Sequence, residues 1–177
     1  MAKIDSTSFQ GVDSSEIAKI YEDVANESDR NAVIVVTSII DDILSSKIKS
    51  LLKAGSAKEQ NGLFMDNGPF SCMYSKVESL YCLGELSELT RKDINLIRKM
   101  RNDAAHLWRN FQLDDEKYVK IMAKMHSYQT VLSIKDSIAQ ENGVSIEEVQ
   151  MVPRVCFNLV TSLLIVLLED RKANQVS

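Results

Sequence analysis

Apolar residues recur every three or four positions along most of this chain, which is the repeat of an amphipathic α-helix. The longest such stretch spans residues 29–54 and ends before Gly55. Shorter stretches predict five further helices. The first begins at Asp13 or Ser14, and the others span about 71–83, 87–107, 114–125 and 152–170. The helix over 87–107 is capped by Ser87 or Thr90, and the helix over 114–125 could extend to Val131. The pattern therefore predicts an all-α protein with about six helices.

Turn-forming residues mark the breaks between these helices. Residues 55–70 are predicted to form one substantial loop, which contains the turn Asn67-Gly68-Pro69. The β-branched residues at 33–40 would also suit a strand, but the helical spacing continues far past the length of a strand. The chain holds only 6 glycines and 2 prolines, which is few for the turns of a β-sandwich or barrel. A single helical bundle is the favoured fold.

Length and composition fit one domain. The chain has 177 residues, of which 45% are apolar and 26% charged, as is typical of a soluble globular protein. We expect a flexible lead over residues 1–12, one helical domain over 13–171 and a tail over 172–177. The lead lacks the apolar segment of a signal peptide, and the apolar run at 157–168 is shorter than the roughly 20 residues of a membrane span. A cytoplasmic protein without a membrane segment is therefore predicted.

The cysteines and histidines do not form a metal-binding pattern. Cys72, Cys82 and Cys156 lie in apolar runs, and we expect them to be buried, reduced thiols. There is no CxxC pair and there are only two histidines, so a typical zinc site is absent. The sequence also lacks Walker A, GxGxxG, GxSxG and HExxH motifs. Neither a metal nor a cofactor is predicted.

The densest group of polar residues lies near the end of the predicted helix over 87–107. It consists of Arg98, Arg101, Asn102, Asp103 and His106. Residues 90–110 carry a net charge of +4, whereas the whole chain carries −4, so this segment could hold a phosphate. The plainer interpretation is a solvated basic face, with His106 interacting favourably with the helix dipole. Spacing alone favours this structural interpretation.

Asp41 and Asp42 interrupt the apolar pattern of the long second helix. One of them must lie near the core, where a carboxylate needs a cation. Arg98 or Arg101 is the expected partner. An interhelical salt bridge is favoured over a catalytic or metal-binding role, and plain exposure to solvent is the remaining alternative.

The turn Asn67-Gly68-Pro69 lies between two aromatic residues, Phe64 and Phe70. One interpretation is a plain connection between helices, and this is the favoured one. The alternative is a loop that covers the polar helix end or packs against a partner.

Several spaced blocks of residues carry a family resemblance. They are Asp29-Arg30-Asn31-Ala32-Val33, Asp41-Asp42-Ile43-Leu44, Leu63-Phe64, Asn67-Gly68-Pro69-Phe70, Lys76-Val77 to Leu83-Gly84, and Ile97-Arg98-Lys99-Met100-Arg101-Asn102-Asp103-Ala104-Ala105-His106. In this order, over roughly residues 29–125, they resemble the mannitol operon repressor (MtlR) family. The resemblance implies a compact, all-helical bacterial regulator that represses genes of sugar-alcohol uptake and metabolism. It also implies the lack of a recognised DNA-binding motif, and so repression through a protein partner.

A second, shorter resemblance falls on the same predicted helix. Arg101, Asn102 and His106 are similar to the Arg-x(4–6)-His motif of the HEPN superfamily, whose helical domains often dimerise and can cleave RNA. On this resemblance Arg101 would hold the scissile phosphate, His106 would contact the 2′-hydroxyl or leaving group, and Asn102 would support them. Arg101 and His106 are five residues apart and diverge by roughly 140° around a helix, so a frayed helix end or a second subunit would be needed.

Three hypotheses remain for the function. The favoured one is a transcriptional regulator, not an enzyme, that acts as a homo-oligomer or with a protein partner. The second is a repressor that binds DNA directly through the basic segment 90–110. The acidic chain argues against it, and so do Glu85 and Glu88, which lie near the turn of the helix-turn-helix candidate 83–97. The third is a metal-independent ribonuclease built on Arg101 and His106.

Overall fold

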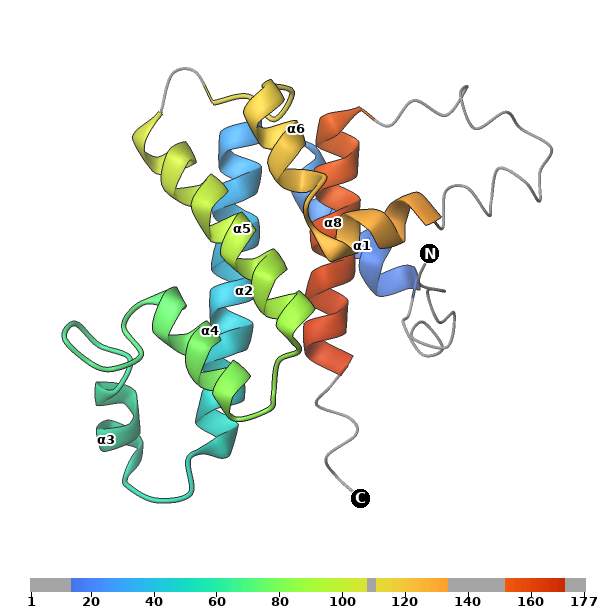
Figure 1. The fold of residues 1–177 in the computed structure, drawn as a ribbon. Helices are drawn as coiled ribbons and strands as arrows, with labels where there is room; N and C mark the ends of the chain where they lie inside the picture. The colour runs from blue at the N-terminus through green and yellow to red at the C-terminus, as the bar shows by residue number, and fades with distance from the viewer. Residues whose placement is uncertain (1–13, 108–110, 134–151, 171–177) are drawn as a thin grey trace.

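Helices form the regular structure throughout the described part of the chain (Figure 1). A computed structural model of the protein describes residues 14–107, 111–133 and 152–170, and these contain no strand. The helices are α1 (Ser14–Ala25), α2 (Asp29–Leu51), α3 (Ala57–Gly62), α4 (Met73–Cys82), α5 (Glu88–His106), α6 (Glu116–Met122) and α8 (Pro153–Asp170), and residues 126–133 are helical as well. The predicted all-α helical bundle is confirmed. The predicted lead (1–12) and tail (172–177) lie outside the described residues.

Two local features differ from the pattern read in the sequence. The expected loop at residues 55–70 contains the short helix α3, which begins at a capping box. In this box Ser56 Oγ accepts a hydrogen bond from Glu59 N–H, and the Glu59 carboxylate accepts one from Ser56 N–H at 2.7 Å. The expected helix over 114–125 is divided, because α6 ends at Met122 and helical structure resumes at residue 126.

The helical segment 126–133 is capped at its start by a buried carboxylate of α5, that of Asp93. Asp93 is only 2% exposed. Its carboxylate accepts hydrogen bonds from His126 N–H and Ser127 N–H, both at 2.8 Å, and from the Ser127 hydroxyl at 2.7 Å. A carboxylate at this position satisfies N–H groups that lack partners within the helix and interacts favourably with the helix dipole. Asp93 therefore fixes the start of the 126–133 segment and joins it to α5.

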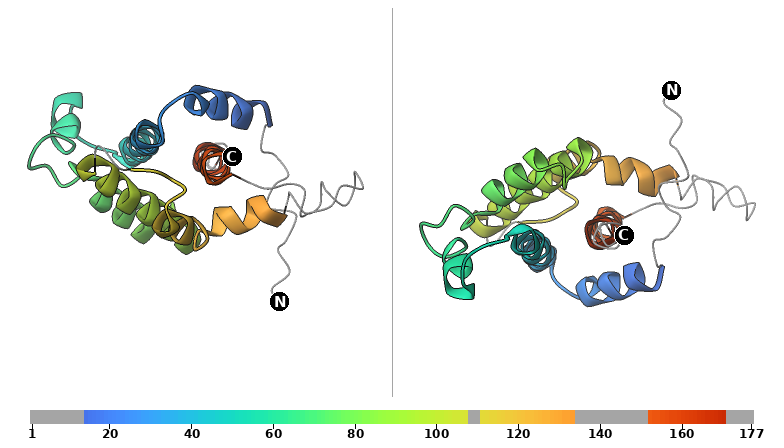
Figure 2. Two further views of the ribbon diagram at one scale, coloured as in Figure 1. Left: turned by 90° about the horizontal axis from the view of Figure 1, so that it is seen from above. Right: turned by 90° about the horizontal axis from the view of Figure 1, so that it is seen from below.

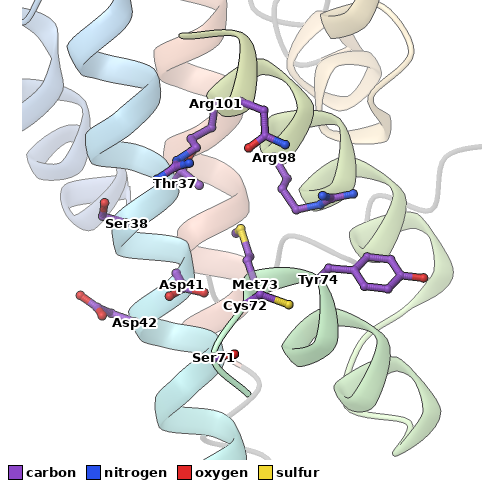
Figure 3. Close-up of a pocket in the computed structure, with 11 residues that line it drawn as sticks. Thr37, Ser38, Asp41, Asp42, Ser71, Cys72, Met73, Tyr74, Arg98 and Arg101 are labelled. Carbon is purple, nitrogen blue, oxygen red and sulfur yellow. The ribbon is translucent and has the colours of Figure 1, made fainter. Parts of the chain in front are cut away.

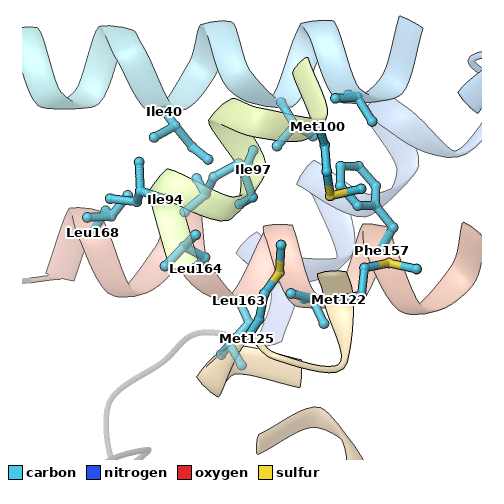
Figure 4. Close-up of a cluster of buried hydrophobic side chains, with 14 of the residues drawn as sticks. Ile40, Ile94, Ile97, Met100, Met122, Met125, Phe157, Leu163, Leu164 and Leu168 are labelled. Carbon is cyan, nitrogen blue, oxygen red and sulfur yellow. The ribbon is translucent and has the colours of Figure 1, made fainter. Parts of the chain in front are cut away.

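Helix α8 lies in the middle of the bundle. Figure 2 shows it end-on, with α1, α2 and the 126–133 segment around it. Most of its side chains are buried, and Phe157 and Leu164 belong to the same apolar core as Ile97 and Met100 of α5 (Figure 4). In the structure this helix is a central part of the core. Among the described helices, none combines the length and the apolar character needed to cross a membrane.

A polar network fastens α5 to the N-terminal end of α2. Arg30 Nε donates a hydrogen bond to the carbonyl oxygen of Ala104 at 2.8 Å. Next to Arg30 in the chain, Asp29 accepts hydrogen bonds from Leu113 N–H at 2.8 Å and from Arg154 of α8 at 2.9 Å. These bonds join segments that are far apart in the sequence. The bond from Arg30 holds the end of α5 against α2, and the bonds of Asp29 connect α2 to Leu113 and to α8. The candidate site lies between α2 and α5.

The three cysteines differ in their surroundings. Cys156 is buried, and this burial raises the pKa of its thiol to about 11. Cys72 and Cys82 are exposed, so the prediction that all three are buried is wrong for these two. Both lie at the ends of α4, and Cys82 is turned away from the buried face that contains Val77 and Leu80.

Candidate functional site

An open cleft of about 550 Å³ lies between α2 and α5 (Figure 3). Its third side is formed by residues 71–74, which lead into α4. Small-molecule sites in proteins have volumes of roughly 300–1,000 Å³, so the cleft is of a suitable size for one. The cleft brings together three residues of the predicted polar group on α5, Arg98, Arg101 and Asn102, with Asp41 and Asp42 of α2. The complete lining is Thr37, Ser38, Asp41, Asp42, Ser71, Cys72, Met73, Tyr74, Arg98, Arg101 and Asn102.

Helix α5 contributes two arginines that are three residues apart and so share one face. Arg98 Nε donates a hydrogen bond to Asn95 Oδ1 at 3.2 Å, and its guanidinium carbon lies 5.3 Å from the centre of the Tyr74 ring. Arg101 is exposed and extends toward α2 near Thr37 (Figure 3). Within the described ranges neither arginine forms an ion pair with a carboxylate. This wall of the cleft therefore presents positive charge.

On the opposite wall, Asp41 is paired with a lysine. Lys76 Nζ lies 2.7 Å from Asp41 Oδ2, and only 6% of the lysine side chain is exposed. The expected interhelical salt bridge is present, but the expected partner, Arg98 or Arg101, is wrong. The reason is that Lys76 lies on the buried face of α4, where an ammonium group needs a nearby carboxylate. A lysine at an apolar position of the helical repeat is the sequence signal that could have identified this partner.

The other polar groups of α2 face the cleft mainly as hydrogen-bond acceptors. The Ser38 hydroxyl donates to the carbonyl oxygen of Ile34 at 3.0 Å, and the Thr37 hydroxyl donates to that of Val33 at 2.6 Å. Because their protons are used within the helix, both hydroxyl groups can only accept further hydrogen bonds. Asp42 is exposed and adds a carboxylate to this wall.

The third side of the cleft contains the exposed thiol of Cys72. Cys72 Sγ lies 3.4 Å from Ser75 Oγ, and the Ser75 hydroxyl donates its proton to the Cys72 carbonyl oxygen at 2.9 Å. The hydrogen bonds with Ser75, and to a smaller extent the charge of Arg98, lower the pKa of the Cys72 thiol. A thiol with a lowered pKa contains more thiolate near neutral pH, and thiolate is the form that reacts.

The predicted loop Asn67-Gly68-Pro69 does not line the cleft but leads into its third side. A Cβ atom at Gly68 would lie 2.4 Å from the carbonyl oxygen of Leu63, which no side chain could tolerate without a shift of the backbone. The rings of Phe64 and Phe70 pack against each other with their centres 5.5 Å apart. The loop is thus a tight connection that sets the position of residues 71–74.

Two residues of the predicted cluster lie elsewhere. Asp103 forms an ion pair with Lys117 and accepts a hydrogen bond from the Tyr118 hydroxyl at 3.4 Å. His106 is exposed in the last turn of α5. Since the cleft is lined by Arg101 but not by His106, it does not assemble the pair required for the ribonuclease interpretation. In the described part of the chain no group of His, Cys, Asp and Glu side chains gathers as a metal site would require.

The helices are arranged as in two solved bacterial proteins. MtlR of Escherichia coli, solved in complex with HPr, matches with a TM-score of 0.66 at 14% sequence identity, over 87% of this chain and 98% of that chain. The chain shares its fold with MtlR. A possible transcriptional regulator, YggD of Shigella flexneri 2a str. 2457T, matches with a TM-score of 0.62 at 13% identity, over 89% and 97% of the two chains. No model of a known protein family matches the sequence, and neither does any curated protein.

The likeness to MtlR confirms, for the fold, the resemblance read from the sequence. That resemblance rested on residues 29–125, whereas the structural match covers 87% of the chain and therefore includes segments outside this range.

Proposed function

We propose that this chain is a transcriptional regulator that acts by binding another protein, and that it is not an enzyme. The observation that carries the proposal is the fold shared with MtlR, because MtlR was solved bound to a protein, HPr. The same fold in YggD, described as a possible transcriptional regulator, supports the same class of function.

The charges on α5 favour a protein partner over direct binding of DNA. Arg91 pairs with Glu78 at 3.3 Å, and Lys92 pairs with Glu88 at 2.7 Å. These carboxylates offset part of the positive charge of segment 90–110, and the chain as a whole carries a net charge of −4. A surface of this kind makes few contacts with phosphates, so its affinity for duplex DNA at physiological salt is low.

The more specific part of the proposal concerns the genes and the assembly. We propose a cytoplasmic bacterial repressor of sugar-alcohol uptake and metabolism that works as a homo-oligomer or in a complex with a protein such as HPr. The ordered blocks over residues 29–125, which resemble the MtlR family, support this choice, and the fold agrees with it.

The test compares protein binding and DNA binding by the purified full chain. E. coli HPr is titrated into the chain by calorimetry at about 0.15 M salt, and we expect saturable binding. In parallel, sheared genomic DNA from the source bacterium is incubated with the chain and the retained fragments are sequenced; we expect no enriched sequence. A sequence-specific gel shift by the pure chain that persists from about 50 to 200 mM salt would contradict the proposal.

A further inference from the structure

The two walls of the cleft have opposite hydrogen-bonding character. On α5, Arg98 and Arg101 carry guanidinium groups, which only donate hydrogen bonds. On α2, the Ser38 hydroxyl and the Asp42 carboxylate present oxygens that accept them, whereas Asp41 Oδ2 is already paired with Lys76 and its Oδ1 is buried. A molecule that lies between the walls must therefore accept hydrogen bonds on one side and donate them on the other.

The charge of the cleft favours a ligand with a negatively charged group. Lys76 neutralises Asp41 in an ion pair of 2.7 Å, whereas Arg98 and Arg101 have no carboxylate partner in the described ranges. With that pair counted as neutral, the two arginines outweigh Asp42. Arginines form strong, often bidentate hydrogen bonds with phosphate oxygens, and two guanidinium charges match the nearly double charge of a phosphate monoester at neutral pH.

One of the two arginines is already held in position. The Arg98 guanidinium is fixed by Asn95 Oδ1 at 3.2 Å and by the Tyr74 ring at 5.3 Å, so it loses little freedom when a ligand binds. The volume of about 550 Å³ suits a small molecule.

We propose that the cleft between α2 and α5 binds a small phosphate monoester that carries hydroxyl or ammonium groups at its other end. Its phosphate contacts Arg101, with the charge of Arg98 adding to the attraction, and its donor groups contact the oxygens of Ser38 and Asp42. This site is additional to the binding of a protein partner and does not depend on it. The test therefore contains no HPr and no DNA.

Cys72 supplies a reporter inside the cleft. Its thiol is exposed and its pKa is lowered, so it should react with iodoacetamide near neutral pH. Cys82 is exposed but does not line the cleft, and it serves as the internal control. Cys156 is buried with a thiol pKa of about 11 and should remain unmodified. Mass spectrometry of the full chain follows the alkylation rate at each cysteine.

Four probe molecules distinguish the contribution of the α5 wall to binding from that of the α2 wall. Glycerol 3-phosphate and phosphoethanolamine carry both a phosphate and donor groups, inorganic phosphate carries only the anion, and glycerol carries only donors. We expect at least one of the first two to protect Cys72, and to bind about tenfold or more tightly than inorganic phosphate, with the Cys82 rate unchanged. Equal affinity for inorganic phosphate would overturn the role of the α2 wall. Failure of all four probes to protect Cys72 would overturn the site.

Substitutions test each wall against matched controls. Arg101→Gln should weaken binding of every phosphate probe by about tenfold or more, whereas Lys99→Gln removes the same charge from an exposed position of α5 outside the cleft and should not. Asp42→Asn should weaken only the probes that carry donor groups, and the exposed Asp66→Asn is its control. Equal losses in R101Q and K99Q would mean general electrostatic attraction and would refute the proposal. Circular dichroism confirms that each variant is folded.

Discussion

Replacing Asp93 by alanine should destabilise this protein far more than replacing an exposed carboxylate. Asp93 is 2% exposed and accepts three hydrogen bonds of 2.7–2.8 Å from His126 and Ser127. Two of the donors are backbone N–H groups at the start of the 126–133 segment, and that segment packs beside α8 (Figure 2). The substitution thus removes the cap of one helical segment and its main polar connection to α5.

The magnitude follows from these contacts. Loss of an N-cap costs about 1–2 kcal/mol. A buried donor left without its charged acceptor costs about 1–3 kcal/mol, although the terms are not fully additive because one residue serves all three donors. We expect a decrease in the free energy of unfolding of about 2–5 kcal/mol for Asp93→Ala, a large part of the ~5–15 kcal/mol typical of a domain. Asp93→Asn keeps one acceptor oxygen and should lose about 1–2 kcal/mol.

Urea unfolding followed by far-ultraviolet circular dichroism measures these differences, with the exposed Asp66→Ala as the control. Hydrogen exchange adds a local test, since the N–H groups of His126 and Ser127 should lose protection before those of α2 do. If Asp93→Ala unfolds within about 0.5 kcal/mol of the wild type, the cap does not contribute to stability as argued and the reasoning is wrong.

Three further predictions concern the cleft and the core. Lys76→Met should cost about 1–3 kcal/mol because it leaves Asp41, whose Oδ1 has no donor among the described residues, without its cation. The double variant Lys76→Met/Asp41→Asn should recover most of this lost stability. A double-mutant cycle measured by urea unfolding that gives no coupling energy between the two residues would refute the prediction. Gly68→Ala should lower stability by about 1–3 kcal/mol because its Cβ would lie 2.4 Å from Leu63 O, whereas Gly62→Ala, with open space around it, should not; thermal melts compare the two. Burial raises the pKa of the Cys156 thiol from 9.0 to about 11 in the folded state. The resulting contribution to stability, about 2–3 kcal/mol, is fully present below pH 9 and should be lost as the pH rises from 9 through 11. Urea unfolding curves across this pH range should show a smaller loss of stability for Cys156→Ala than for the wild type. An equal loss in the two proteins would contradict the role given to Cys156.

Helical periodicity predicts an element when the element has an apolar face. α2, α4, α5 and α8 have such faces, and their observed ends lie within a few residues of the expected ones. α3 has no buried residue, so its only signal was the capping-box spacing of Ser56 and Glu59. The break before residue 126 had no local signal, because its cap, Asp93, comes from another helix.

The candidate site was predictable in its charges but not in its pairings. Arg98, Arg101 and Asn102 share a helix face by spacing alone, and the cleft contains them. The contribution of residues 71–74 and the pairing of Asp41 with Lys76 depend on which face α4 turns toward α2. That orientation is a property of the packed bundle, and a pattern along one helix does not contain it.

The pairing of Asp41 with Lys76 determines whether the cleft can attract an anion. If Asp41 had paired with Arg98 or Arg101, as the sequence suggested, the two charges would cancel inside the cleft. Lys76→Met recreates this situation, because it leaves the Asp41 carboxylate available to Arg101. We therefore expect Lys76→Met to weaken the protection of Cys72 by glycerol 3-phosphate, although both arginines of the cleft remain. The added Asp41→Asn change should restore it, since the competing carboxylate is gone. Unchanged protection in Lys76→Met would show that Arg101 does not respond to Asp41.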